Sequence, residues 1–183
     1  PTMPAKRVVI TGLGAVTPLG NNVQETWKGL KEGRSGIGPI TIFNAESFPT
    51  KIAGEVKSFD YKKWGSSAGD TGFLGRNSYF ALEAVEEAVK DSGFHDGRID
   101  PRRVGIYFGA GDGGFDFKEY ARVVSRSITN GHYEVSVPDY FKNSLKMLRS
   151  ESILEQEPYQ VINHLSKAFG VKGTVLNCLT ACA

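Results

Sequence analysis

A cysteine near the end of the chain is the residue best suited to covalent chemistry. Cys182 stands in the small-residue segment Thr180-Ala181-Cys182-Ala183, directly after an apolar run, residues 174–180, that predicts a buried strand. A thiol at a strand-to-helix turn is reactive because a helix N-terminus stabilises the thiolate, while nearby backbone N–H groups stabilise an oxyanion. Taken alone, the small residues around Cys182 are typical of an inert buried thiol. Cys178 lies inside the predicted strand and is interpreted as inert.

A glycine-rich turn, residues 109–114, follows another predicted strand and contains Gly111, Asp112 and Gly113. Successive backbone N–H groups in such a turn can hold an anion, although the carboxylate of Asp112 opposes this. A flexible or closely packed turn is the favoured interpretation, and a wall of a substrate pocket is a third.

An earlier turn, Gly12-Leu13-Gly14, resembles the start of a dinucleotide-binding unit. The next glycine, Gly20, comes six residues after Gly14, whereas the nucleotide fingerprint needs one three residues on. A tight turn after a strand is therefore favoured, and a nucleotide-binding domain is kept as a weaker alternative.

The three histidines, His95, His132 and His164, have no spacing that makes a metal site with the cysteines. We expect neither a metal nor a cofactor. His164 falls on a predicted helix and is interpreted as a packed or capping residue in preference to a general base.

Alternating strands and helices must position these residues. The patterns predict strands over 7–11, 51–56, 104–108 and 174–180, and helices over 22–33, 77–92, 116–128 and 158–169. Most of residues 115–157, apart from one helix, is predicted to be an irregular insertion. This alternation favours an α/β fold with a largely parallel sheet, forming one structural unit.

Composition excludes several classes of function. Lys and Arg number 22 against 20 Asp and Glu, a net charge of +2, which argues against nucleic acid or an anionic membrane as a partner. No apolar run approaches the ~20 residues of a membrane span. Two cysteines and no apolar signal segment predict a cytoplasmic protein. Pro1 and Thr2 precede Met3 and are interpreted as a cloning remnant.

A set of motifs in order along the chain resembles the β-ketoacyl-acyl-carrier-protein synthases of the second, elongating type. The set comprises residues 7–20, Trp27-Lys28-Gly29-Leu30, residues 33–37, Ala53-Gly54-Glu55-Val56, Asp91-Ser92-Gly93, Val104-Gly105, residues 169–173 and Thr180-Ala181-Cys182-Ala183. The last of these resembles the nucleophile motif of that family.

The resemblance implies a thiolase-like fold of two similar halves, of which this chain is the N-terminal half, with a mixed five-stranded sheet between helices. It implies a decarboxylative condensation of an acyl thioester with malonyl-acyl carrier protein, in fatty acid or polyketide biosynthesis. Cys182 would accept the acyl chain, and Gly111, Asp112 and Gly113 would contact substrate. A homodimer is implied, as is a C-terminal half that carries two active-site histidines and a lysine. Without that half, this chain alone is expected to be inactive.

Several features depart from the family pattern, including the longer and more polar residues 115–157 and Thr174-Val175 after Gly173. Asp112 stands where relatives have an apolar residue lining the acyl pocket, which argues against a long saturated acyl substrate. Residues 66–75 contain no Lys or Arg, although relatives carry a basic run there that docks the acidic carrier protein. These departures predict a divergent synthase of a specialised polyketide or unusual fatty acid pathway. A non-catalytic scaffold or dimerisation half of a ketosynthase-like complex is kept as the alternative function, although the retained Cys182 argues against it.

Overall fold

The computed structural model describes residues 7–64, 74–94, 99–111, 116–128 and 134–179. The chain divides into two compact units, one comprising residues 1–62 and 80–101 and the other residues 63–79 and 102–183. The expectation of a single structural unit is therefore wrong.

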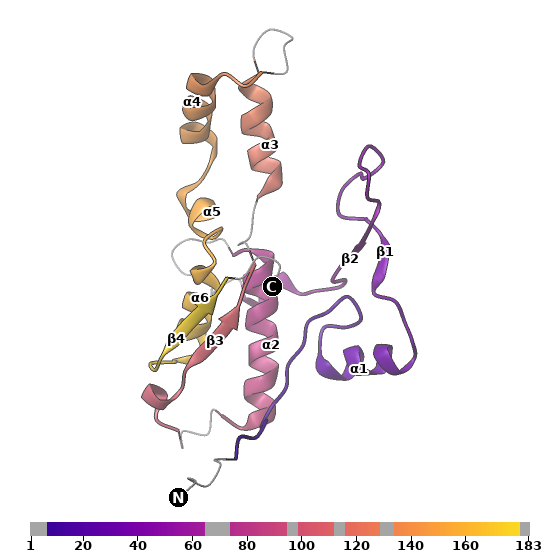
Figure 1. Ribbon diagram of the computed structural model, residues 1–183, viewed down its shortest axis with the longest axis vertical. Coiled ribbons are helices and arrows are strands. Elements are labelled where there is room, and N and C mark those ends of the chain that lie inside the picture. Colours follow the sequence, from indigo (N-terminus) through magenta and orange to yellow (C-terminus); the bar gives the residue numbers. More distant parts are fainter. Residues whose placement is uncertain (1–6, 65–73, 95–98, 112–115, 129–133, 180–183) are drawn as a thin grey trace, which may run out of the picture. The chain divides into compact units, whose positions relative to one another are not determined.

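Two helices and a small sheet organise the first unit (Figure 1). Helix α1, Val23–Lys31, begins where Asn22 Oδ1 accepts a hydrogen bond from the Glu25 N–H at 2.8 Å, as predicted, and it ends before Gly33 at φ +66°. Helix α2, Arg76–Ser92, confirms the second predicted helix, and most of it belongs to this unit. Strands β1, Ile37–Pro39, and β2, Ile52–Gly54, pair in antiparallel fashion.

The predicted strand over residues 7–11 is wrong. This segment has no strand pairing, and Val8 and Ile10 are 93% and 82% exposed. The chain just after it runs along α2, where the carboxylates of Asp91 and Glu87 accept hydrogen bonds from the N–H groups of Leu13 and Ala15, each at 3.0 Å. Because these two donors are used by side chains, the N–H groups of Leu13 and Ala15 do not take part in a sheet ladder.

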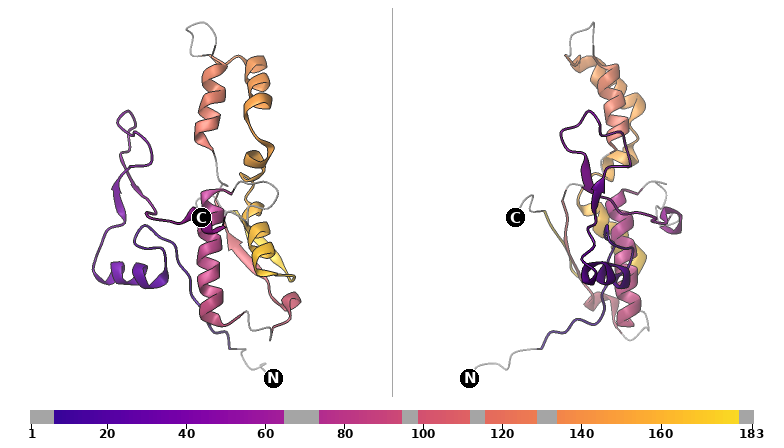
Figure 2. Two further views of the ribbon diagram at one scale, coloured as in Figure 1. Left: turned by 180° about the vertical axis from the view of Figure 1, so that it is seen from behind. Right: turned by 90° about the vertical axis from the view of Figure 1, so that its right-hand side faces the viewer.

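Helices and a parallel strand pair organise the described part of the second unit. Its elements are β3, Ile106–Gly109; α3, Phe117–Arg126; α4, Val137–Met147; α5, Ser150–Leu154; α6, Tyr159–Phe169; and β4, Val175–Cys178, together with the first turn of α2. A 3-10 turn, Pro101–Arg103, precedes β3. Helices α3 and α4 stand side by side in both views (Figures 1 and 2).

Two predictions about this region need correction. Residues 115–157 are not irregular, because α4 and α5 occupy most of their second half. The described residues also form two separate two-stranded sheets where a five-stranded sheet was expected. Helix α4 has an ordinary start, with Ser136 Oγ accepting from the Asp139 N–H at 3.4 Å and Pro138 in the first turn.

The strand pair β3–β4 is covered on one face by α6 (Figures 1 and 2). Val161, Ile162 and Leu165 of α6 are buried and form part of the core. On the opposite face, Tyr107 and Leu176 stand in register with each other and are 78% and 52% exposed. Helix α6 ends at Gly170, whose φ of +64° confirms the predicted glycine stop.

Two glycines set how the strand pair begins. A Cβ on Gly105 would lie 2.6 Å from the Thr174 carbonyl oxygen, and one on Gly173 would lie 2.2 Å from the Val104 oxygen. The Gly173 N–H donates to the Val104 oxygen at 3.0 Å, which requires this close approach. The register of β3 against β4 is therefore fixed by backbone contact at its first residues.

Candidate functional site

The carboxyl ends of β3 and β4 lie next to each other. Ile106 pairs with Val175 and, at the far end, Gly109 pairs with Cys178. The Ala110 N–H then donates to the Cys178 carbonyl oxygen at 3.1 Å, one residue beyond the strands. The glycine-rich turn and the segment leading to Cys182 therefore leave the sheet at the same edge, where ligands of open α/β sheets commonly bind.

The predicted site residues are only partly within the described chain. Gly111 is exposed, lies two residues beyond the end of β3, and has no atom within 4 Å of an added Cβ. Asp112, Gly113 and Cys182 lie outside the described residues. Cys178 is the last residue of β4 and is half-buried, which confirms its predicted place inside the strand.

A buried carboxylate, Glu155, joins three parts of the second unit. Its Oε1 accepts hydrogen bonds from the Gly75 N–H at 2.9 Å and from the Ser78 hydroxyl, at the start of α2. Its Oε2 lies 2.8 Å from His164 Nε2 on α6. Because an ionised carboxylate only accepts hydrogen bonds, Nε2 is the donor. The side chains of His164 and Glu155 are 13% and 5% exposed, and Ser78 is fully buried.

The environment of Glu155 favours its ionised form. Burial raises the pKa of this carboxyl, but the hydrogen bonds from His164, Ser78 and the Gly75 N–H, with the charge of His164, lower the pKa below its usual value. His164 is packed, in agreement with the prediction of a packed or capping residue, and its ring is hydrogen-bonded to Glu155. Its partner Glu155 was missed, because nothing in the sequence separates it from the neighbouring acidic residues Glu151 and Glu157.

A second carboxylate, Glu55, holds the turn after β1. Its Oε1 accepts from the Thr41 N–H at 2.8 Å, and its Oε2 accepts from the Thr41 hydroxyl at 2.7 Å. The Thr41 hydroxyl and then the Thr41 N–H lower the pKa of Glu55 below its usual value. This group closes a loop and contacts no predicted site residue among those described.

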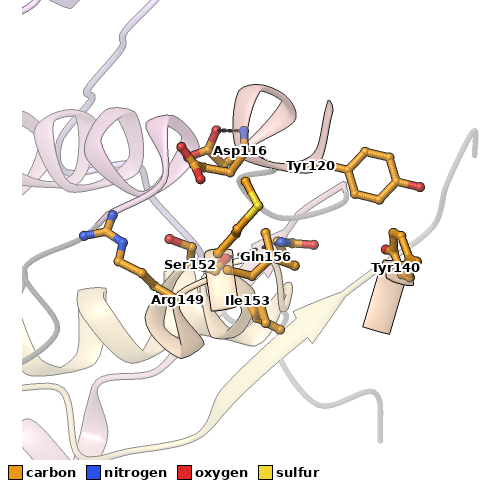
Figure 3. A pocket seen from close by; sticks show the side chains of 10 residues that line it. Asp116, Tyr120, Tyr140, Arg149, Ser152, Ile153 and Gln156 are labelled. Atoms are coloured by element: carbon orange, nitrogen blue, oxygen red, sulfur yellow. Dashed lines mark hydrogen bonds between the residues drawn. The ribbon is translucent and has the colours of Figure 1, made fainter. Parts of the chain in front are cut away.

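A cavity of about 470 Å³ lies among α3, α4 and α5 (Figure 3). The Tyr120 and Tyr140 rings, with centroids 6.4 Å apart, lie at one side of it, while Asp116 and Arg149 lie at the other. Asp116 Oδ1 accepts from the Glu119 N–H at 3.1 Å and so caps α3. Gly111, the predicted site residue that falls within the described chain, is not among the residues that line this cavity.

Neither a metal site nor a membrane-spanning helix is found in the part of the chain that the structure describes. Within those residues, no group of three or more His, Cys, Asp or Glu side chains is placed to hold a metal ion. Of the helices described, none is long and apolar enough to cross a membrane.

Comparison with known proteins gives a consistent result. The sequence model of the β-ketoacyl synthase N-terminal domain matches residues 5–183. The 3-oxoacyl-[acyl-carrier-protein] synthase 2 of Coxiella burnetii is 34% identical over 98% of this chain and 40% of its own length. The chain thus spans about two fifths of that relative.

Solved structures agree in fold. A β-ketoacyl synthase from Burkholderia phymatum is 26% identical with a TM-score of 0.62, covering 98% of this chain and 40% of that one. The ishigamide ketosynthase/chain length factor is 24% identical with a TM-score of 0.71, covering 96% of this chain and 40% of that one. The thiolase-like α/β fold expected from the sequence is therefore confirmed. The chain belongs to the β-ketoacyl synthase family, and it comprises that family's N-terminal domain.

Proposed function

We propose that the protein containing this chain is a ketosynthase, which condenses an acyl thioester with malonyl-acyl carrier protein through an acyl-cysteine at Cys182. The observation that carries the proposal is the shared edge of β3 and β4, from which both the glycine-rich turn and the segment toward Cys182 emerge. A nucleophile and a pocket wall that start from one edge can meet around one substrate carbon.

The proposed reaction has two stages, acylation of the cysteine and condensation. The Cys182 thiolate attacks the thioester carbonyl carbon, the carrier thiol leaves, and the Cys182 N–H donates one hydrogen bond to the developing oxyanion. The malonyl thioester then loses carbon dioxide, and the resulting carbanion attacks the acyl carbon, so that the Cys182 thiolate leaves. Gly111, Asp112 and Gly113 form part of the wall around the acyl group.

The second stage needs groups outside this chain. The chain spans about 40% of its Coxiella burnetii relative. We assign stabilisation of the decarboxylating malonyl group to histidines in the remaining portion, and we expect residues 1–183 alone not to condense. The acyl carrier protein is the partner that fits this chemistry, and the working assembly is a homodimer.

The test is covalent labelling of the full-length protein. Incubation with an acyl thioester, or with the inhibitor cerulenin, is followed by intact-mass and peptide mass spectrometry. A stable adduct on Cys182 is the expected result, and Cys182→Ala abolishes it. Cys178→Ala is the matched control, because this thiol is half-buried in β4 and the variant should label like the wild type.

Absence of an adduct in folded full-length protein would refute the proposal. That result would favour the alternative of a non-catalytic scaffold half, in which Cys182 is only a packed thiol.

A further inference from the structure

The hydrogen bonds of Glu155 link separate segments of the second unit, unlike an ordinary loop contact. Both carboxylate oxygens are used, and all three donors come from other segments: Gly75 and Ser78 at the start of α2, and His164 on α6. Burial of a carboxylate costs several kcal/mol of desolvation free energy unless the group is fully hydrogen-bonded. The cluster therefore favours the one arrangement of these segments in which all three hydrogen bonds to Glu155 are made.

Helix α6 connects this cluster to the proposed active site. His164 directly precedes Leu165 on α6, and Leu165 is 1% exposed and belongs to the hydrophobic core. Helix α6 packs against both β4 and β3. A shift of α6 would therefore be transmitted to both strands, since close-packed interiors do not absorb displacement.

The strands carry the shift to the reacting atoms. Strand β4 ends at Cys178, four residues before Cys182, and its last carbonyl is tied to Ala110, next to Gly111. Their first residues are fixed by the close contacts at Gly105 and Gly173. Backbone contacts thus fix the first residues of the two strands, and α6 fixes one face of the pair. The position of α6 therefore sets the direction in which the carboxyl ends of β3 and β4 point.

We infer that Glu155 and His164 are positioning residues for the nucleophile: their hydrogen bond fixes α6 against the start of α2 and thereby aligns the β3–β4 edge that carries Gly111 and the segment to Cys182. This inference rests on the proposed function. Neither side chain touches substrate. They act on the rate of cysteine acylation through the placement of the strand pair.

The experiment measures the first-order rate constant of Cys182 acylation in the full-length protein at saturating hexanoyl-N-acetylcysteamine, followed by intact mass. Glu155→Leu removes every acceptor at similar volume and should slow acylation by about tenfold or more, because misplacement by about 1 Å can cost up to 10²-fold. Glu155→Gln keeps an acceptor for Gly75 and Ser78 and should recover most of the rate. Glu157→Gln, an exposed neighbour, should match the wild type.

A merely structural role would give a different pattern. It would lower the unfolding midpoint and the final amplitude of acylation, since fewer molecules are folded, while leaving the rate constant unchanged. Should Glu155→Leu fail to fold, His164→Leu removes only the bond to α6 and should slow acylation at least about threefold. Wild-type rate constants in every folded Leu variant would overturn the inference.

A second probe separates this inference from the proposed function. Alkylation of Cys182 by iodoacetamide needs no correct substrate, and its rate should fall in the same variants because the thiolate loses its stabilising environment. Wild-type protein that is never acylated, with alkylation that still depends on Glu155, would refute the ketosynthase proposal and retain the positioning role. Normal acylation at a rate that does not depend on Glu155 would support the ketosynthase proposal and refute the positioning role.

Discussion

The contact of Gly14 with helix α2 allows a quantitative test of the first unit. A Cβ on Gly14 would lie 1.8 Å from the Ala84 carbonyl oxygen and 2.9 Å from the Ala88 nitrogen, whereas real Cβ contacts essentially never fall below 3.0 Å. Gly14→Ala must therefore push the segment away from α2 by about 1 Å, and overpacking of this kind typically costs about 1–3 kcal/mol.

The displacement also breaks hydrogen bonds on both sides of Gly14. The Leu13 and Ala15 N–H groups donate to Asp91 and Glu87, each at 3.0 Å, and a retreat of about 1 Å takes both beyond bonding range. Bonds to charged groups contribute about 1.5–3 kcal/mol when buried and less when exposed, as at Asp91. The total loss expected for Gly14→Ala is about 3 kcal/mol.

The matched control is Gly38→Ala, in the middle of β1. No atom lies within 4 Å of its added Cβ, and its φ is not in the left-handed region. This variant should raise the free energy of unfolding by about 0.4–1 kcal/mol, because alanine lowers the conformational entropy of the unfolded chain. The two glycine-to-alanine changes should therefore shift stability in opposite directions.

Urea unfolding followed by circular dichroism measures both variants. Gly14→Ala should lower the midpoint by about 1 M. Hydrogen exchange adds a local readout, in which the amides of Leu13 and Ala15 lose protection in Gly14→Ala only. Equal midpoints and equal protection in the two variants would show that the segment does not lie against α2 as described.

Two further predictions concern the core and the buried carboxylates. Leu165→Ala should lower the free energy of unfolding by about 3 kcal/mol, while Leu145→Ala, at 88% exposure, should change it by less than about 0.5 kcal/mol; similar losses at both positions would contradict the burial of Leu165. Glu55 and Glu155 both have a pKa below the usual 4.5, so their contribution to stability is complete above that pH and is lost as the pH falls through the folded-state values. Urea midpoints between pH 7 and 3 should therefore fall less steeply in Glu55→Gln and Glu155→Gln than in the wild type, and parallel curves would refute the linkage.

Local signals in the sequence were sufficient for the best-defined helices. Asn22 and Gly33 mark the ends of α1, and Gly170 marks the end of α6, so capping chemistry predicted these boundaries well. Helix α4 carried a comparable signal in Ser136 and Pro138, but the polar composition around it was interpreted as irregular structure.

Tertiary contacts account for what the sequence did not predict. The β-branched run at Val8 and Ile10 has strand propensity, yet the chain that follows gives its N–H groups to carboxylates of α2. Glu155 and Ser78 are 77 residues apart in the sequence, and no periodic pattern encodes so distant a contact. The proposed nucleophile motif around Cys182 stays a prediction from resemblance to a family, since small residues around a thiol carry little physical information by themselves.

The parallel pairing of β3 with β4 has a consequence for how the family can vary. All of α3, α4, α5 and α6 lie between the two strands in the sequence, so their pairing closes a long loop. The entropy of closing such a loop depends only weakly on its length, about 0.6 kcal/mol for each doubling. Helical segments such as α3 and α4 can therefore lengthen, shorten or be exchanged at little cost while β3 and β4 stay in register.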